Sequence, residues 1–171
     1  MVDFRALAGA ELRWVRTGFL PAAFALFHEE TEIGSVAWEN LFSSHAVLRT
    51  DGGSWHVRRK GLRHLVVEDE ASGDVVAAMR LHLFGSGELA FADGRTVAFR
   101  RNALLPPAWS FFDGADAEGS ELLTVRGRMA ELFRGGFCTI QPAGVAMPDA
   151  GLLALLGVYV LVRRARRRAR H

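Results

Sequence analysis

The sequence predicts a mainly β protein whose strands close into a barrel around a helix at the C-terminal end of the chain. Two observations support this fold class. Short runs of β-branched and aromatic residues, separated by Gly and Asp, recur about every eight to twelve residues, a spacing typical of an all-β barrel or sandwich. The apolar run 151–162 fits a helix that is apolar on every side, and such a helix must be buried on every side. A barrel closed around that helix would bury it.

The strands are expected from Ile33 onward. The runs are IGSVAW, HAVLRT, SWHVRR, RHLVVED, DVVAAMRLHLF, ELAFA, RTVAFR, AWSFFD, ELLTVRG and GFCTIQP. Helical periodicity is weak before the end of the chain. Since no Pro-rich or Ser-rich linker divides the 171 residues, we expect one domain, 1–162, followed by an Arg-rich tail, 163–171.

The segment ELAFADGRTVAF predicts a β-hairpin. A two-residue turn at Asp93 and Gly94 would scatter its apolar residues over both faces. A three-residue loop, 92–94, with Gly94 in the left-handed conformation, pairs Leu89 with Val97 instead. That register unites four apolar residues on one face, and we predict it. These residues are Leu89, Phe91, Val97 and Phe99.

The segment SWHVRRKGLRHLVV predicts a second hairpin, with residues 59–61 as its loop. In this register Trp55 opposes Leu65 on the core face, and His56 opposes His64 on the polar face. Opposed histidines could share a metal ion, but a zinc site needs a third ligand and usually a fourth. No such ligand is evident, so we predict no metal site.

The tip of that hairpin gathers the dense basic cluster that lies outside the tail. Its members are Arg58, Arg59, Lys60 and Arg63. Guanidinium groups make bidentate contacts with phosphate, so the tip is a candidate site for a phosphate-bearing headgroup or another polyanion. The alternative is a solvated loop that pairs with neighbouring acids, namely Glu68, Asp69 and Glu70.

A helix is expected over about 149–162, because Asp149 can cap it and Pro148 opposes an earlier start. Six arginines follow: Arg163, Arg164, Arg166, Arg167, Arg168 and Arg170. We expect them at the barrel mouth, where cations complement the dipole of the helix C-terminus. They could contact anionic lipid, at about 1 kcal/mol per residue, or bind nucleic acid nonspecifically. A solubilising terminus that caps the helix is the third alternative.

A membrane anchor is a further alternative for the apolar run. As a helix, residues 151–162 extend roughly 18 Å, whereas the hydrocarbon core is roughly 30 Å thick. Extension to 144–162 places Asp149 in the bilayer, at a cost on the order of 3 kcal/mol. Arginines also prefer the cytoplasmic side, which would put the preceding domain outside without a convincing export signal. We therefore favour the buried helix over the tail anchor.

Three segments together resemble the tubby-like superfamily, and most closely its bacterial LURP-one-related members. They are GELAFADGRTVAFRR, AWSFFDGADAEGSELLTV and GGFCTIQPAGVAMPDAGLLALLGVYVLVRR, roughly the C-terminal half. The resemblance implies a closed antiparallel barrel of about twelve strands around a central hydrophobic helix. Phospholipid scramblases, in the same superfamily, bind calcium through an acidic segment just before the last helix. In this chain that segment is GVAMPDAG, where Asp149 is the only carboxylate, so we do not expect calcium binding. Tubby domains bind phosphoinositides through exterior basic residues, and the hairpin tip is an analogue in kind.

Charge is distributed unevenly along the chain. Removing the six tail arginines from 21 basic residues leaves 15 against 19 acidic ones, or about −4 before Arg163. This argues against a domain shaped overall to hold a polyanion.

The single cysteine, Cys138, excludes an intramolecular disulfide, and we expect it to be a small buried hydrophobe.

No motif names a reaction, because the chain lacks a GxSxG elbow, a Walker loop, HExxH and paired CxxC. We predict a non-enzymatic binding or scaffold domain without a cofactor, associated peripherally with anionic membrane through the tail and the hairpin tip. The alternatives are a tail-anchored protein using 144–162 and an enzyme whose site the sequence does not reveal. The run 18–27 is a weak export signal, so a cytoplasmic location at the inner membrane face is expected.

Overall fold

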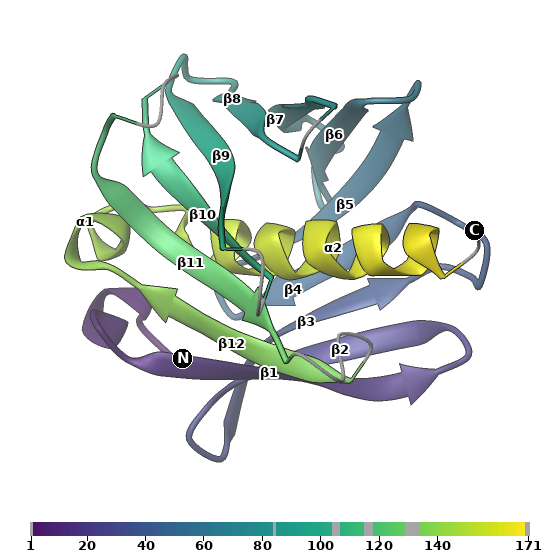
Figure 1. The fold of residues 1–171 in the computed structure, drawn as a ribbon, viewed down its shortest axis with the longest axis horizontal. Coiled ribbons are helices and arrows are strands. Elements are labelled where there is room, and N and C mark those ends of the chain that lie inside the picture. The colour runs from purple at the N-terminus through teal and green to yellow at the C-terminus, as the bar shows by residue number, and fades with distance from the viewer. Residues whose placement is uncertain (1, 84, 104–106, 115–117, 129–133, 170–171) are drawn as a thin grey trace.

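Twelve antiparallel strands form one closed barrel around a long C-terminal helix in the computed structural model (Figure 1). This confirms the predicted fold class. The structure describes residues 2–83, 85–103, 107–114, 118–128 and 134–169. The strands are β1 (Glu11–Phe19), β2 (Ala22–His28), β3 (Thr31–Trp38), β4 (Ala46–Thr50), β5 (Gly53–Lys60), β6 (His64–Asp69), β7 (Val75–Leu81), β8 (Gly87–Phe91), β9 (Thr96–Ala103), β10 (Ala108–Asp113), β11 (Glu121–Gly127) and β12 (Gly135–Ile140). The helices are η1 (Phe4–Leu7), α1 (Pro142–Val145) and α2 (Ala150–Arg168).

Each strand pairs with its neighbours in sequence, and β1 pairs with β12 to close the barrel. Because consecutive strands run in opposite directions, the turns alternate between the two ends. We call one end the mouth; it carries the turns at 20–21, 39–45, 61–63 and 82–86. The C-terminal end of α2 emerges there (Figure 1). The opposite end, where α2 begins, is called the base.

Helix α2 is the centre of the core. Its residues are buried from Ala150 to Arg163, and Ala165 is buried too. Tyr159 stacks on Trp38, with ring centroids 5.3 Å apart, and its hydroxyl donates a hydrogen bond to the Ser44 carbonyl at 2.5 Å. The barrel wall thus surrounds the helix, which explains why the run is apolar on every side.

The ten predicted runs correspond to β3 through β12. In the first predicted hairpin, Leu89 pairs with Val97 and Gly94 has a φ of 92°, which confirms the three-residue loop. All four apolar residues of this hairpin are buried, as expected. The first two strands, β1 and β2, were missed. The sequence of β2, AAFALFH, is almost continuously apolar and therefore also fits a short apolar signal segment.

The loop predicted at 59–61 is wrong, since β5 continues to Lys60 and the turn lies at 61–63. His56 therefore opposes Glu68, and His64 opposes Lys60. The pairing is shifted by an even number of residues, so the same side chains still face the core. An alternating pattern cannot distinguish the two registers. The observed register also adds an ion pair between Arg58 Nε and Glu68 Oε2 at 3.0 Å.

Asp149 occupies the N-cap position of α2, but the predicted side-chain cap is absent. Its carboxylate instead accepts a hydrogen bond from Arg95 Nη2 at 2.6 Å, which ties the start of the helix to the β8–β9 turn. The helix also continues past residue 162 to Arg168, so most of the arginine segment forms its last turns. Within the described ranges, no helix combines the length and the apolar character that a membrane crossing needs.

Candidate functional site

The predicted basic tip of the second hairpin divides between two surfaces. Arg58 and Lys60 lie on the outer face of β5, and Arg58 is neutralised by Glu68. Arg59 lies on the opposite face of the strand and lines a cavity at the mouth, and Arg63 lines a neighbouring one. The structure therefore brings two of the four predicted residues to the end of α2.

The arginines of α2 differ strongly in their surroundings. Arg163 is only 7% exposed, although it carries a charge. Arg164 is half-buried, with its guanidinium 5.3 Å from the ring centroid of Trp109. Arg166 lies 5.3 Å from the ring centroid of Trp38 and donates a hydrogen bond to the Leu41 carbonyl. Two others, Arg167 and Arg168, are exposed. The remaining predicted site residue, Arg170, lies outside the described residues.

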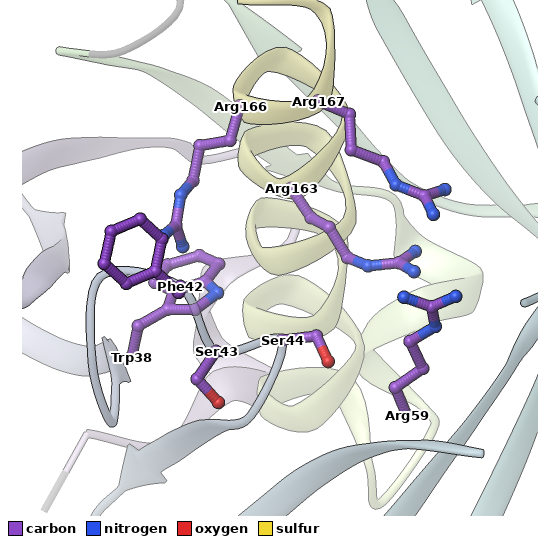
Figure 2. Close-up of a pocket in the computed structure, with 8 residues that line it drawn as sticks. All are labelled: Trp38, Phe42, Ser43, Ser44, Arg59, Arg163, Arg166 and Arg167. Carbon is purple, nitrogen blue, oxygen red and sulfur yellow. The ribbon is translucent and has the colours of Figure 1, made fainter. Parts of the chain in front are cut away.

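Three cavities among the described residues adjoin the emerging helix at the mouth, and two of them gather several of its arginines. The first has a volume of about 110 Å³, and its basic lining residues are Arg59, Arg163, Arg166 and Arg167 (Figure 2). The second is larger, at about 430 Å³, and its basic lining residues are Arg63, Arg163, Arg164, Arg167 and Arg168. Both cavities are therefore lined by guanidinium groups.

Three of the four arginines that line the first cavity have no carboxylate beside them in the described part of the chain. Across the described part of the chain, no carboxylate lies within 4.0 Å of the guanidinium groups of Arg59, Arg163 or Arg167. Burial lowers the pKa of Arg163, and the positive charges of Arg167 and Arg59 lower it further. Burial also lowers the pKa of Arg164 to about 10. Both shifts reflect cations held away from water and from anions.

Large apolar side chains are exposed around the same mouth. Among the described residues, seven such side chains are exposed: Phe19, Leu20, Leu41, Phe42, Leu62, Val75 and Leu83. All of them except Val75 belong to the mouth turns or flank them, and we call these six the apolar ring. Members of the ring line cavities together with the helix arginines: Phe42 with Arg163, and Leu62 and Leu83 with Arg164. The arginines thus lie inside a rim of exposed apolar tips.

Acidic residues gather at the base. The described base turns and the start of α2 carry Glu29, Glu30, Asp51, Glu70, Asp74, Asp93, Glu118 and Asp149. In the described mouth turns, the one carboxylate is Glu39, which lies 3.4 Å from His45. The charge imbalance along the sequence is therefore also a separation in space, from an acidic base to a basic mouth.

No group of three or more His, Cys, Asp or Glu side chains that could hold a metal ion occurs in the described residues. His56 faces Glu70, with Nε2 3.7 Å from Oε1, and is not opposed to His64. Cys138 is buried as expected, and burial raises its pKa to about 12.

Sequence reasoning missed the apolar ring. Its signal is a large apolar residue at a turn position beside Gly, Pro or Asn, as in GFLP, ENLFSS and KGLR. Such residues are unusual in turns, where small and polar types dominate. Comparisons with protein-family models, with curated proteins and with solved structures found no match for this chain.

Proposed function

We propose that this protein is a peripheral membrane-binding domain, which docks its barrel mouth on an anionic lipid surface. The observation that carries the proposal is the apolar ring around the arginines of α2. An exposed apolar rim on a folded domain marks a surface that leaves water on binding. A basic centre inside that rim selects a partner that is both apolar and negatively charged, as the surface of an anionic bilayer is.

The magnitudes favour binding through both contributions together. Each basic side chain near an anionic membrane contributes about 1 kcal/mol, and full burial of a Leu or Phe side chain contributes roughly 1.5–3 kcal/mol. Phe42 is 80% exposed and Leu20 is 76% exposed, so burial of either side chain on a membrane would remove much apolar surface from water. The acidic base disfavours the opposite orientation on the same membrane.

The tubby-like assignment and the cytoplasmic location remain predictions, and they agree with this proposal. Tubby domains bind lipid headgroups, but through the barrel exterior, whereas the surface proposed here is the mouth. The function proposed here is non-enzymatic.

Co-sedimentation with vesicles tests the proposal. The full chain should bind vesicles of phosphatidylserine and phosphatidylcholine, bind pure phosphatidylcholine weakly, and lose most binding at high salt, because salt screens surface charges. Phe42→Ser removes an apolar tip without touching a charge. It should weaken binding about tenfold, since a loss of roughly 1.4 kcal/mol corresponds to that factor.

Val75→Ser is the matched control, because Val75 is an exposed apolar residue at the base. It should leave vesicle binding unchanged. Docking through the mouth would be refuted if Phe42→Ser and Val75→Ser lost vesicle affinity equally. It would also be refuted if vesicle binding depended neither on salt concentration nor on lipid charge.

A further inference from the structure

We propose that the first cavity at the mouth is a binding site for a dianionic phosphate group, held by the guanidinium groups of Arg59, Arg163 and Arg167. The phosphate could belong to a lipid headgroup or to a soluble molecule. The inference deepens the proposed function, and only its lipid form rests on that function. Figure 2 shows the three guanidinium groups pointing toward one another on one side of α2.

Arg163 is the central observation. It is only 7% exposed, and within the described chain it has neither a carboxylate partner nor a hydrogen-bond acceptor. A buried cation without a partner is unfavourable, and the nearby charges of Arg59 and Arg167 repel it further. A bound anion would remove both penalties at once.

The cavity is built to hold a small group in a fixed position. Arg163 projects from a buried turn of α2, and Arg59 is held by a hydrogen bond from its Nε to the Gly61 carbonyl at 2.5 Å. Trp38 forms part of the wall, and its indole N–H is buried without a hydrogen-bond partner in the described chain. The volume of about 110 Å³ exceeds the ~10–15 Å³ needed for one water molecule, so a tetrahedral oxyanion with some water fits.

The chemistry favours phosphate over a single carboxylate. Four arginines line the cavity; the guanidinium groups of three converge, while that of Arg166 lies over the Trp38 ring (Figure 2). A ligand with two negative charges balances three converging cations better than a ligand with one. A phosphate monoester has a second pKa of about 6 and is mainly a dianion at neutral pH. Its oxygens accept paired hydrogen bonds from the planar guanidinium fork.

Thermal unfolding of the full chain in inorganic phosphate tests the site, with sodium chloride at equal ionic strength as the reference. The melting temperature should rise with phosphate concentration and then saturate. Arg163→Met should raise the melting temperature without phosphate, because it removes an unpaired buried charge. It should also weaken phosphate binding about tenfold or more, the factor expected for losing a charge-assisted hydrogen bond.

Lys60→Met is the matched control, since it removes one positive charge from the same hairpin on its outer face. It should keep the phosphate response. Because Arg167 is exposed, Arg167→Gln should leave the folding stability unchanged. It should also weaken phosphate binding about tenfold. A phosphate response that is equal in the wild type, Arg163→Met and Arg167→Gln overturns the site.

Vesicles identify the source of the phosphate. A preference for phosphatidic acid over phosphatidylserine at equal vesicle charge, lost in Arg163→Met, assigns the site to a lipid phosphomonoester. A phosphate response without that preference assigns it to a soluble phosphate compound. If phosphatidylserine vesicles bind but phosphate has no effect, this inference falls and the proposed function stands. If phosphate stabilises the chain but no anionic vesicle binds, the proposed function falls and the site stands.

Discussion

Gly157 tests most directly whether α2 is enclosed by the barrel. On an exposed helix, Gly→Ala stabilises by about 1 kcal/mol, because alanine has the higher helix propensity. Here a Cβ at Gly157 would lie 2.5 Å from Val125 Cγ2 and 3.3 Å from Phe111 Cε2. Carbon atoms pack at ~3.5–4.0 Å, so the nearer contact is short by about 1 Å. Val125 is fully buried and β-branched, and it cannot rotate away at low cost.

Overpacking costs roughly 1–3 kcal/mol, and a contact this short with a rigid buried side chain belongs in the upper part of that range, at about 2–3 kcal/mol. That cost outweighs the propensity gain of about 1 kcal/mol. Gly157→Ala should therefore destabilise the chain by about 1–2 kcal/mol, or roughly 2–8 °C in melting temperature for a domain of this size. Gly151→Ala is the control in the same helix, because its nearest contacts are 3.1 Å from half-exposed Phe4 and 3.3 Å from Thr50. It should leave the melting temperature unchanged or raise it. Stabilisation by Gly157→Ala would show that α2 does not pack against β10 and β11.

Two further outcomes follow from the core. Tyr159→Phe should lower the free energy of unfolding by roughly 1 kcal/mol in denaturant melts, because the Ser44 carbonyl loses its donor. Burial raises the pKa of Cys138 from 9.0 to about 12, so above pH ~9 the unfolded chain loses a thiol proton that the folded chain keeps. The thiol should thus reduce stability by up to ~1.4 kcal/mol per pH unit between those values, and Cys138→Ala should flatten that slope. A native thiol that reacts rapidly with a disulfide reagent at pH 8 would contradict its burial.

The barrel and its helix could be predicted because burial determines both patterns. Strands with one buried face alternate apolar and polar residues, and a helix buried on every side is apolar throughout. The hairpin at 92–94 followed from four apolar residues that only one loop length unites. The position of the turn at 61–63 could not be predicted in this way, because an even shift in register leaves every side chain on its original face. The arginines could be placed at the mouth from the sequence, but the cavities there could not be derived from local patterns. Phe42 and Arg163 are distant in sequence, and they line one cavity only because α2 runs through the barrel.

The burial of Arg163 bears on the explanations that the sequence left open for the end of the chain. A solubilising terminus needs exposed charges, and Arg167 and Arg168 satisfy that description. Capping of the helix dipole needs little positive charge, because a helix C-terminus carries the equivalent of roughly half a negative charge. Neither explanation requires Arg163 to be enclosed beside Arg59, away from water and from every described carboxylate. An anion bound beside Arg163 would offset the cost of burying its charge, and this is the physical basis of the phosphate site that we propose at the mouth.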